Sequence, residues 1–282
     1  MAGQTMDGDA TSKDPDRRVI RVGGEERVHF LESLLTCRIE DEPAGRLVYG
    51  ALLTPQGKIV SDLMAFIGED DIALDVPAAA ADDLVRRLTL YRLRAKVTLE
   101  ATEEAVVVGP KGFGTQDPRG KGIGGRALAS DGAGLNAAAL TAYHERRFQA
   151  VAPEAVRDYG LLDAFPHDAN MDVTHGVDFK KGCFVGQEVV SRMQHRGTAR
   201  RRTVRVEGTS PLPAAGTPLE RNGKPVGTMG SSSGAHGLAV VRIDRAGPGV
   251  TAGGTALTLT VPEGAPFALA APAEDQTAEP TA

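Results

Sequence analysis

The stretch Lys180–Glu188, with the sequence KKGCFVGQE, is the most informative part of this 282-residue chain. Two glycines flank a cysteine and two apolar residues, and an amide and a carboxylate follow at once. Because glycine accepts positive φ and close backbone contacts, the pattern predicts a sharp loop that leads into a helix over Gln187–Met193. Neighbouring lysines and a helix start favour a thiolate, so Cys183 is the candidate reactive residue. The alternative is a glycine-rich turn around a buried cysteine, since free cysteines are often buried.

The residues upstream of this stretch read as an antiparallel meander followed by a helix. Leu47–Leu53 and Lys58–Ile67 have the composition of two strands, and the Pro and Gly of Thr54–Gly57 suit a turn between them. Ile72–Val76 pairs back as a third strand, and Pro77 opens a helix at its first turn. This order of elements predicts an α+β fold with antiparallel sheets and flanking helices.

The rest of the chain divides by composition. We expect a main region over 17–200 with sub-domains of about 17–108 and 109–200, in which the glycine-rich segment 109–134 is a long loop. Short β-branched strands between Gly and Pro turns predict a small C-terminal β-barrel over 201–269. The polar ends 1–16 and 270–282 are predicted to be disordered tails.

Composition excludes several classes of function. A net charge of −5, no Trp and only 4% aromatic residues argue against a dedicated nucleic-acid binder. Two distant cysteines are too few to hold a cluster or a zinc ion, and the six histidines show no ligand spacing, so no metal site is predicted. No apolar run is long enough to span a membrane. We expect a cytoplasmic monomer with both thiols reduced.

The stretch Lys181–Glu188 resembles the K-G-C-[YF]-x-G-Q-E signature of the YgfZ family, which is related to the aminomethyltransferase (T-protein) of the glycine cleavage system. The resemblance extends from about Arg17 to Arg202. It is carried by further motifs in Leu53–Asp62, Leu90–Val97, Asp117–Arg119 with Gly125-Arg126, Phe165–Asp172, and Ser191–Gly197.

The resemblance implies a T-protein-like folate-binding fold that holds tetrahydrofolate between its sub-domains. It further implies an accessory function in the maturation or repair of iron–sulfur enzymes, including those that modify tRNA. Its partners would then be folate and iron–sulfur client enzymes, without direct contact to nucleic acid. Two alternatives stay open, a true folate-dependent aminomethyltransferase and a non-catalytic folate-binding scaffold, and the sequence leaves undecided whether any reaction is catalysed.

Five residues are candidates for binding the folate, each with a structural alternative. Asp62 matches the folate-site carboxylate of the T-protein, or is a solvated carboxylate at the end of a strand. Lys181 pairs with the folate glutamate tail or acts on Cys183, or is a surface charge. Gln187 and Glu188 offer polar groups to a heterocycle, or Glu188 simply occupies a helix first turn. Asn170 contacts the ligand, or holds its own loop by capping.

Overall fold

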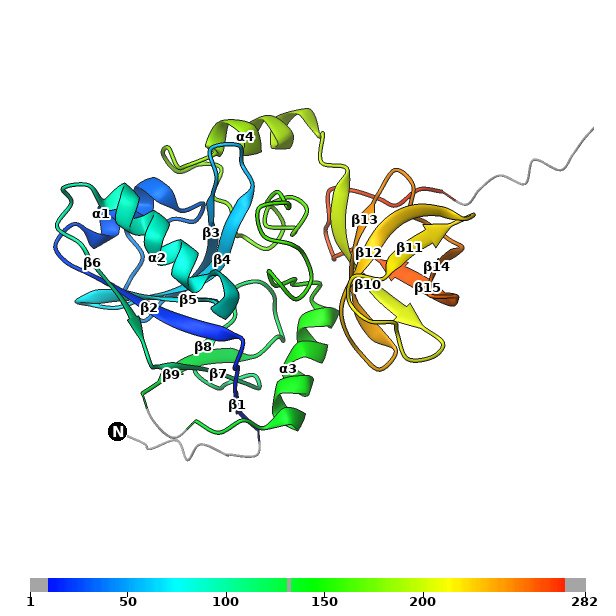
Figure 1. Ribbon diagram of the computed structural model, residues 1–282, viewed down its shortest axis with the longest axis horizontal. Coiled ribbons are helices and arrows are strands. Elements are labelled where there is room, and N and C mark those ends of the chain that lie inside the picture. The colour runs from blue at the N-terminus through cyan, green and yellow to red at the C-terminus, as the bar shows by residue number, and fades with distance from the viewer. Residues whose placement is uncertain (1–9, 131–132, 272–282) are drawn as a thin grey trace, which may run out of the picture.

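The computed structural model describes residues 10–130 and 133–271, which form three β-structures and four helices (Figure 1). The helices are α1 (Arg27–Leu34), α2 (Ala78–Arg92), α3 (Ala137–Gln149) and α4 (Gln187–Arg196). The strands are β1 (Ser12–Lys13), β2 (Arg17–Gly23), β3 (Leu47–Leu53), β4 (Ile59–Ile67), β5 (Asp71–Pro77), β6 (Thr98–Thr102), β7 (Ala105–Gly109), β8 (Thr115–Gln116), β9 (Gly125–Ala129), β10 (Arg201–Gly208), β11 (Pro218–Arg221), β12 (Lys224–Ser233), β13 (His236–Arg242), β14 (Val250–Ala252) and β15 (Thr255–Thr260). No helix in these described ranges has the length and apolar character needed to cross a bilayer.

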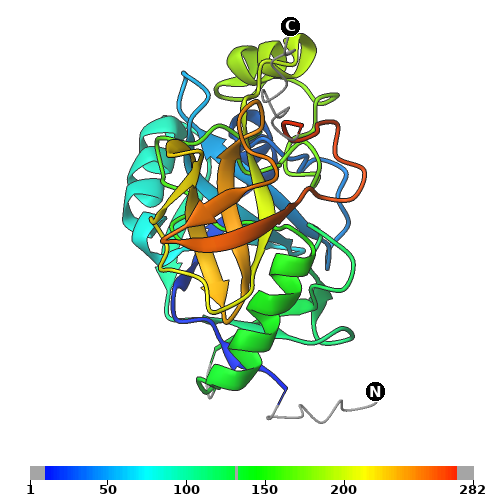
Figure 2. The ribbon, with the colours of Figure 1, turned by 90° about the vertical axis from the view of Figure 1, so that its right-hand side faces the viewer.

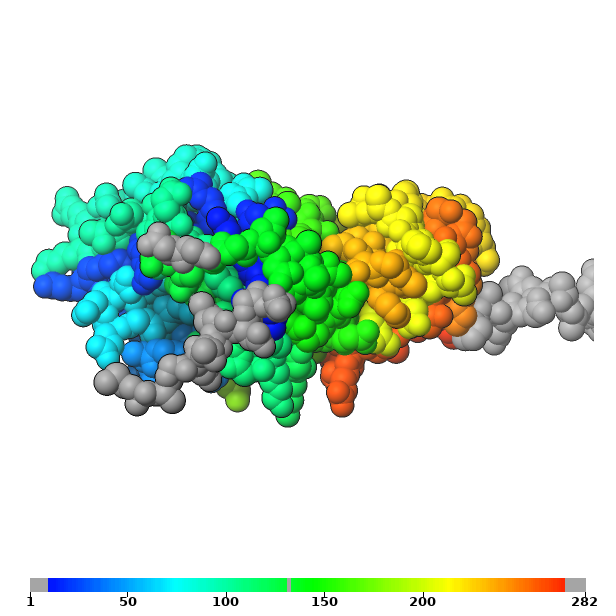
Figure 3. Space-filling model, turned by 90° about the horizontal axis from the view of Figure 1, so that it is seen from below, coloured from blue at the N-terminus to red at the C-terminus, as the bar shows by residue number. Residues whose placement is uncertain are grey.

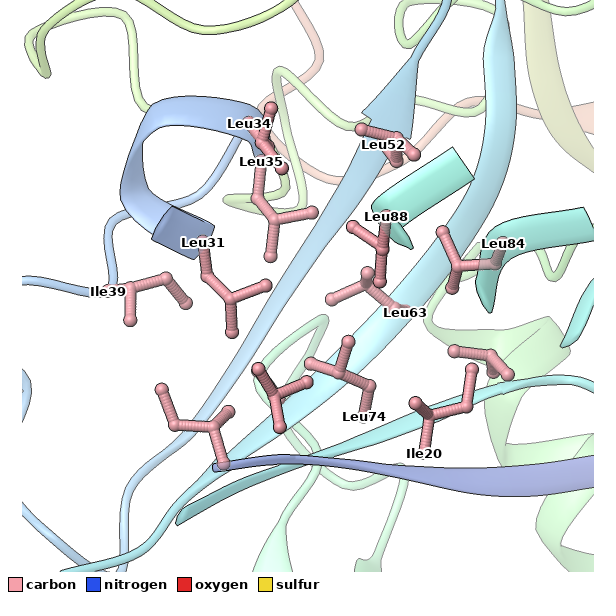
Figure 4. Close-up of a cluster of buried hydrophobic side chains, with 14 of the residues drawn as sticks. Ile20, Leu31, Leu34, Leu35, Ile39, Leu52, Leu63, Leu74, Leu84 and Leu88 are labelled. Atoms are coloured by element: carbon pink, nitrogen blue, oxygen red, sulfur yellow. The ribbon is translucent and has the colours of Figure 1, made fainter. Parts of the chain in front are cut away.

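An antiparallel five-stranded sheet in the order β3-β4-β5-β2-β6 forms the first body. Helices α1 and α2 cover one face of it, where their leucines pack with apolar side chains of the sheet (Figure 4). Alternate β3 residues such as Tyr49 and Leu53 face a second apolar cluster on the other side. Because both faces are covered, nearly every side chain of β4 is buried.

A second sheet, in the order β1-β7-β9-β8, packs against α3, whose first turn is capped by the side chain of Asn136. Two predictions are wrong here. The glycine-rich segment 109–134 is not all loop, because it contains β8 and β9.

The second correction concerns the N-terminal tail. The tail was predicted to reach residue 16, yet Ser12–Lys13 pairs with β7, and Asp14 is fully buried with its carboxylate bound by Arg157. An ion pair and backbone pairing hold this polar segment, and hydrophobicity alone does not reveal either. The remaining tail residues, 1–9 and 272–282, lie outside the described residues.

The C-terminal strands close into an antiparallel barrel in the order β10-β13-β12-β11-β14-β15 (Figure 2). Its interior is filled by apolar side chains that include Val204, Leu219 and Val241. The first barrel residues are tied to the preceding segment by ion pairs from Arg201 to Asp168 and from Arg202 to Asp172. These arginines therefore form a charged junction between the two regions. The predicted architecture, an α+β fold with a small C-terminal barrel, is confirmed.

Candidate functional site

The KGCFVGQE loop is positioned by contact between two glycines that are far apart in sequence. Gly186 has φ 80° and precedes α4, as the sequence predicted. A Cβ at Gly186 would lie 2.6 Å from the carbonyl oxygen of Thr54 and 3.1 Å from the Cα of Gly57. The start of α4 therefore rests on the tip of the β3–β4 hairpin, which Figure 1 shows beneath the helix. Only glycine permits both the conformation and the approach.

Lys181 holds the other end of the loop. Its side chain is 1% exposed, and Nζ donates to the carbonyl oxygens of Glu32, Leu35 and Cys37 at 2.7, 2.8 and 2.7 Å. Nζ also lies 3.2 Å from the Glu32 carboxylate. The carbonyls of Glu32 and Leu35 belong to the last turn and C-cap of α1, where a cation is favourable. An ammonium has three donors, and all are used, so the structure assigns Lys181 to the scaffold instead of to a folate carboxylate or Cys183.

Cys183 is exposed between these two fixed points. The next residue, Phe184, is buried in the cluster beneath β3 and anchors the loop. Gly182 is also exposed, and a Cβ there would meet nothing within 4 Å. The thiol is thus presented to solvent on a loop whose ends are held. Cys37 differs, because burial raises the pKa of its thiol to about 12, which makes it unreactive.

The amide and carboxylate that end the motif lie on α4. Gln187 Nε2 donates to the carbonyl of Gly182 at 3.3 Å, which links the helix back to the thiol loop. The Glu188 side chain is 85% exposed, lies in the first turn of α4 and pairs with Arg192. Glu188 thus occupies the helix first turn that the alternative interpretation expected.

A cleft of about 390 Å³ opens beside the base of this loop. Tyr49 and Phe179 provide aromatic surface, and Arg38, Arg46 and Lys180 provide cationic groups. Arg38 already pairs with Asp178 at 3.0 Å and Arg46 with Glu42 at 3.6 Å, whereas the exposed ammonium of Lys180 has no partner among the described residues. The cleft can therefore accept a flat, anionic molecule.

Asp62 lies behind the cleft, not in its lining. It is 1% exposed, and one carboxylate oxygen accepts hydrogen bonds from the Ala155 amide and the Tyr159 hydroxyl, both at 2.9 Å. The other oxygen is 3.7 Å from Arg17 and has no hydrogen-bond partner in the described ranges. Burial, followed by the Asp62 charge, raises the pKa of Tyr49. Tyr49 lines the cleft and interacts with Asp62, so it lies between Asp62 and the cleft.

Asn170 is fully buried, with φ 54°, a conformation that asparagine tolerates better than most residues. Its Nδ2 donates to the carbonyl of Thr203 on β10, at 2.8 Å. This bond joins the loop to the barrel, a structural role that differs from the expected capping of its own loop. Its Oδ1 is buried and has no hydrogen-bond partner among residues 10–130 and 133–271.

Comparison with known proteins identifies the family to which this chain belongs. The iron-sulfur cluster assembly factor IBA57, mitochondrial, of Homo sapiens is 30% identical over 92% of this chain and 83% of its own. The chain belongs to the YgfZ–IBA57 family. The tRNA-modifying protein YgfZ of Sodalis glossinidius is 27% identical over 73% of this chain and 74% of its own. The resemblance inferred from the motifs is confirmed.

Two further matches concern the fold of this YgfZ–IBA57 family member. The model of the CAF17 C-terminal beta-barrel domain matches residues 200–267. The glycine cleavage system aminomethyltransferase T from Bartonella henselae superposes with a TM-score of 0.69, 19% sequence identity, and coverage of 89% of this chain and 84% of its own. The T-protein-like fold is therefore confirmed.

This YgfZ–IBA57 fold contains a buried ionic network that the sequence motifs did not predict. Arg126 is fully buried and contacts Asp75, Asp117 and Glu154, the shortest contact being 2.5 Å to Asp75. Burial raises the pKa of Asp117, but Arg119 and Arg126 outweigh it and lower the value to about 2. The Asp117–Arg119 and Gly125-Arg126 motifs were visible, but their partners on other strands were not.

Proposed function

We propose that this protein is a folate-binding accessory factor that supports maturation or repair of iron–sulfur enzymes, including enzymes that modify tRNA. Family membership supports the first part, because the human relative is named an iron–sulfur cluster assembly factor. The name of the Sodalis relative supports the link to tRNA. The observation that carries the proposal is the exposed Cys183 thiol on a loop fixed by Lys181 and Gly186.

Cys183 contributes one ligand to a cluster that a partner carries. In the described residues, no group of three or more His, Cys, Asp and Glu side chains is arranged to hold a metal ion. The cluster is therefore cargo, and the partner supplies its remaining ligands. To bind iron, the Cys183 thiol loses its proton to solvent. The Gln187 side chain positions the thiol through its bond to the Gly182 carbonyl.

The cleft beside the loop is the proposed folate site. Its residues fit a reduced folate, because Tyr49 and Phe179 suit the flat pterin and Lys180 suits a tail carboxylate. The hydroxyl of Tyr49 is buried and interacts with Tyr159 and Asp62, so Tyr49 offers a ligand its ring and not its hydroxyl. Asp62 lies behind Tyr49, whereas Asn170 is buried against β10 and is not among the residues that line the cleft. Bound tetrahydrofolate would supply a one-carbon unit or reducing equivalents.

Thermal stability in the presence of tetrahydrofolate tests the folate site. At a hundredfold excess over the dissociation constant, a ligand of the native state adds about 2.7 kcal/mol to the free energy of unfolding. Lys180→Met should reduce that gain without changing the stability of the free protein. An unchanged melting temperature at saturating folate would support the scaffold alternative.

The thiol is tested in a host strain that lacks its own YgfZ-family protein. The activity of an iron–sulfur enzyme is measured with the wild-type chain, Cys183→Ala and Cys37→Ala. We expect Cys183→Ala to lose the restored activity and Cys37→Ala to retain it, because only Cys183 is exposed. Full activity with Cys183→Ala would remove the thiol from the function.

A further inference from the structure

Helix α2 ends on a residue whose conformation and exposure are both unfavourable. Leu93 follows the helix with φ 47° and ψ −104°, and it is 87% exposed. Glycine is the usual residue at a helix end with positive φ, because a side chain is strained there. Leucine at this position therefore destabilises the free protein, both through backbone strain and through exposed apolar surface. No buried apolar cluster in the described ranges includes Leu93, so internal packing does not offset that cost.

Leu93 belongs to a mixed apolar and basic surface, which we name the α2 patch: Leu90, Tyr91, Leu93 and Arg94. Leu90 is 66% exposed and Tyr91 37% exposed, and Leu90 lies three residues before Leu93 on the helix end. Arg94 is exposed and has no hydrogen bond or ion pair with any described residue. Among the basic residues from 86 to 96, Arg86 and Arg87 pair with Asp83 and Lys96 pairs with Glu25. The patch therefore complements a partner surface that combines apolar side chains with a carboxylate opposite Arg94.

Helix α1 connects the α2 patch to the Cys183 loop. At the start of α1, the Glu26 carboxylate accepts a hydrogen bond from the Lys96 amide at 2.6 Å. At its end, the α1 carbonyls accept hydrogen bonds from Lys181, two residues before Cys183. The helix has 8 residues, and this length corresponds to about 12 Å. Figure 1 shows α1, the end of α2 and the loop before α4 at the same end of the molecule.

We propose that the α2 patch docks the iron–sulfur protein that meets Cys183, through a face of that partner that combines carboxylates with apolar side chains. This inference rests on the proposed function. A partner that spans α1 contacts Leu90 and Leu93 at one end and brings its cluster to the thiol at the other. The patch has only one arginine without an internal contact, which is too little charge for an anionic membrane and enough for one acidic side chain.

The test uses the full chain in the host strain described above, at low and at high expression. The docking variants are Leu90→Glu with Leu93→Glu, and Leu93→Gly alone. Leu135→Glu is the matched control, because Leu135 is 64% exposed but precedes α3, away from α1. Melting temperatures establish that each variant folds, and the activity of the iron–sulfur enzyme reports function. Cosedimentation with vesicles that contain phosphatidylserine tests the membrane alternative.

We expect the double variant to reduce client activity about tenfold at low expression, as the loss of central interface residues does. High expression should restore that activity by mass action, whereas Cys183→Ala stays inactive at both levels. Leu93→Gly should melt about 2 °C higher, because strain is relieved, and still lose activity at low expression. Leu135→Glu should match the wild type.

Three results would overturn the docking inference. Wild-type activity of the double variant and Leu93→Gly, with Cys183→Ala inactive, would refute the patch and leave the proposed function standing. If high expression did not restore client activity to the double variant, the patch would not act by strengthening the binding of the partner. Vesicle binding that the double variant abolishes, with client activity unchanged, would assign the patch to a membrane. Activity of Cys183→Ala would instead refute the proposed function itself.

Discussion

Replacement of Lys181 by methionine separates the scaffold role of this lysine from ligand binding. Methionine keeps an unbranched apolar chain but removes the ammonium and its three hydrogen bonds to the end of α1. It also leaves the Glu32 carboxylate without its cationic partner. Loss of one partner from a buried charged pair costs about 3–5 kcal/mol, because the other groups stay buried and unpaired. For a folding unit of this size, we expect a melting temperature roughly 10 °C lower.

Lys180→Met is the matched control, because Lys180 is adjacent in sequence but exposed, with no side-chain partner among the described residues. Thermal unfolding followed by circular dichroism should show wild-type stability for Lys180→Met and the large loss for Lys181→Met. Folate titration should show the reverse, with weakened binding only in Lys180→Met. Equal melting temperatures for the two variants would refute the scaffold role and return Lys181 to the candidate ligands of folate.

Three further predictions concern single groups. Gly186→Ala should destabilise the protein by about 2–4 kcal/mol in denaturant titrations, since its Cβ meets backbone at 2.6 Å, whereas Gly182→Ala should be neutral. Burial and a neighbouring arginine lower the pKa of His144 from 6.5 to about 3, so the unfolded chain binds a proton in that window that the folded protein does not. Stability must then fall as the pH falls from 6.5, by up to about 1.4 kcal/mol per pH unit, and His144→Gln should remove that slope. Tyr49→Phe should leave folate binding unchanged, because the ring that lines the cleft is kept and the lost hydroxyl is buried beside Tyr159 and Asp62; a marked loss of binding would show that the hydroxyl contacts the folate.

The sequence predicted those features that depend on neighbouring residues. The turn before α4 follows from the intrinsic freedom of Gly186, and the β3–β4 hairpin from alternating residues around Thr54–Gly57. The barrel follows from short strands between Gly and Pro turns. In each case the decisive interaction lies within a few residues, so one sequence window contains it.

The sequence could not predict features that depend on distant partners. The carbonyls that bind Lys181 lie 144 to 149 residues away, and no local pattern identifies them. Asp62 was predicted at the end of a strand, but it lies within β4 and is buried, because Ala155 and Tyr159 from a later segment bind it. Strand β1 was missed because its stability comes from pairing with β7. Whether a charged side chain is buried depends on the tertiary structure. The motifs therefore identified important residues, but they did not predict the burial or the partners of those residues.

The KGCFVGQE motif therefore has two kinds of residue. Lys181, Phe184 and Gly186 are tied to α1, the β3 cluster and the hairpin, and each would be costly to replace in any protein with this fold. A side chain at Gly182 would meet nothing within 4 Å and Cys183 is exposed, so stability gives no reason for the identity of either residue. A small residue next to an exposed thiol makes sense where a second molecule must approach the sulfur closely. For that reason, Gly182→Val should fold like the wild type and still reduce iron–sulfur client activity, and normal activity would show that no close approach occurs.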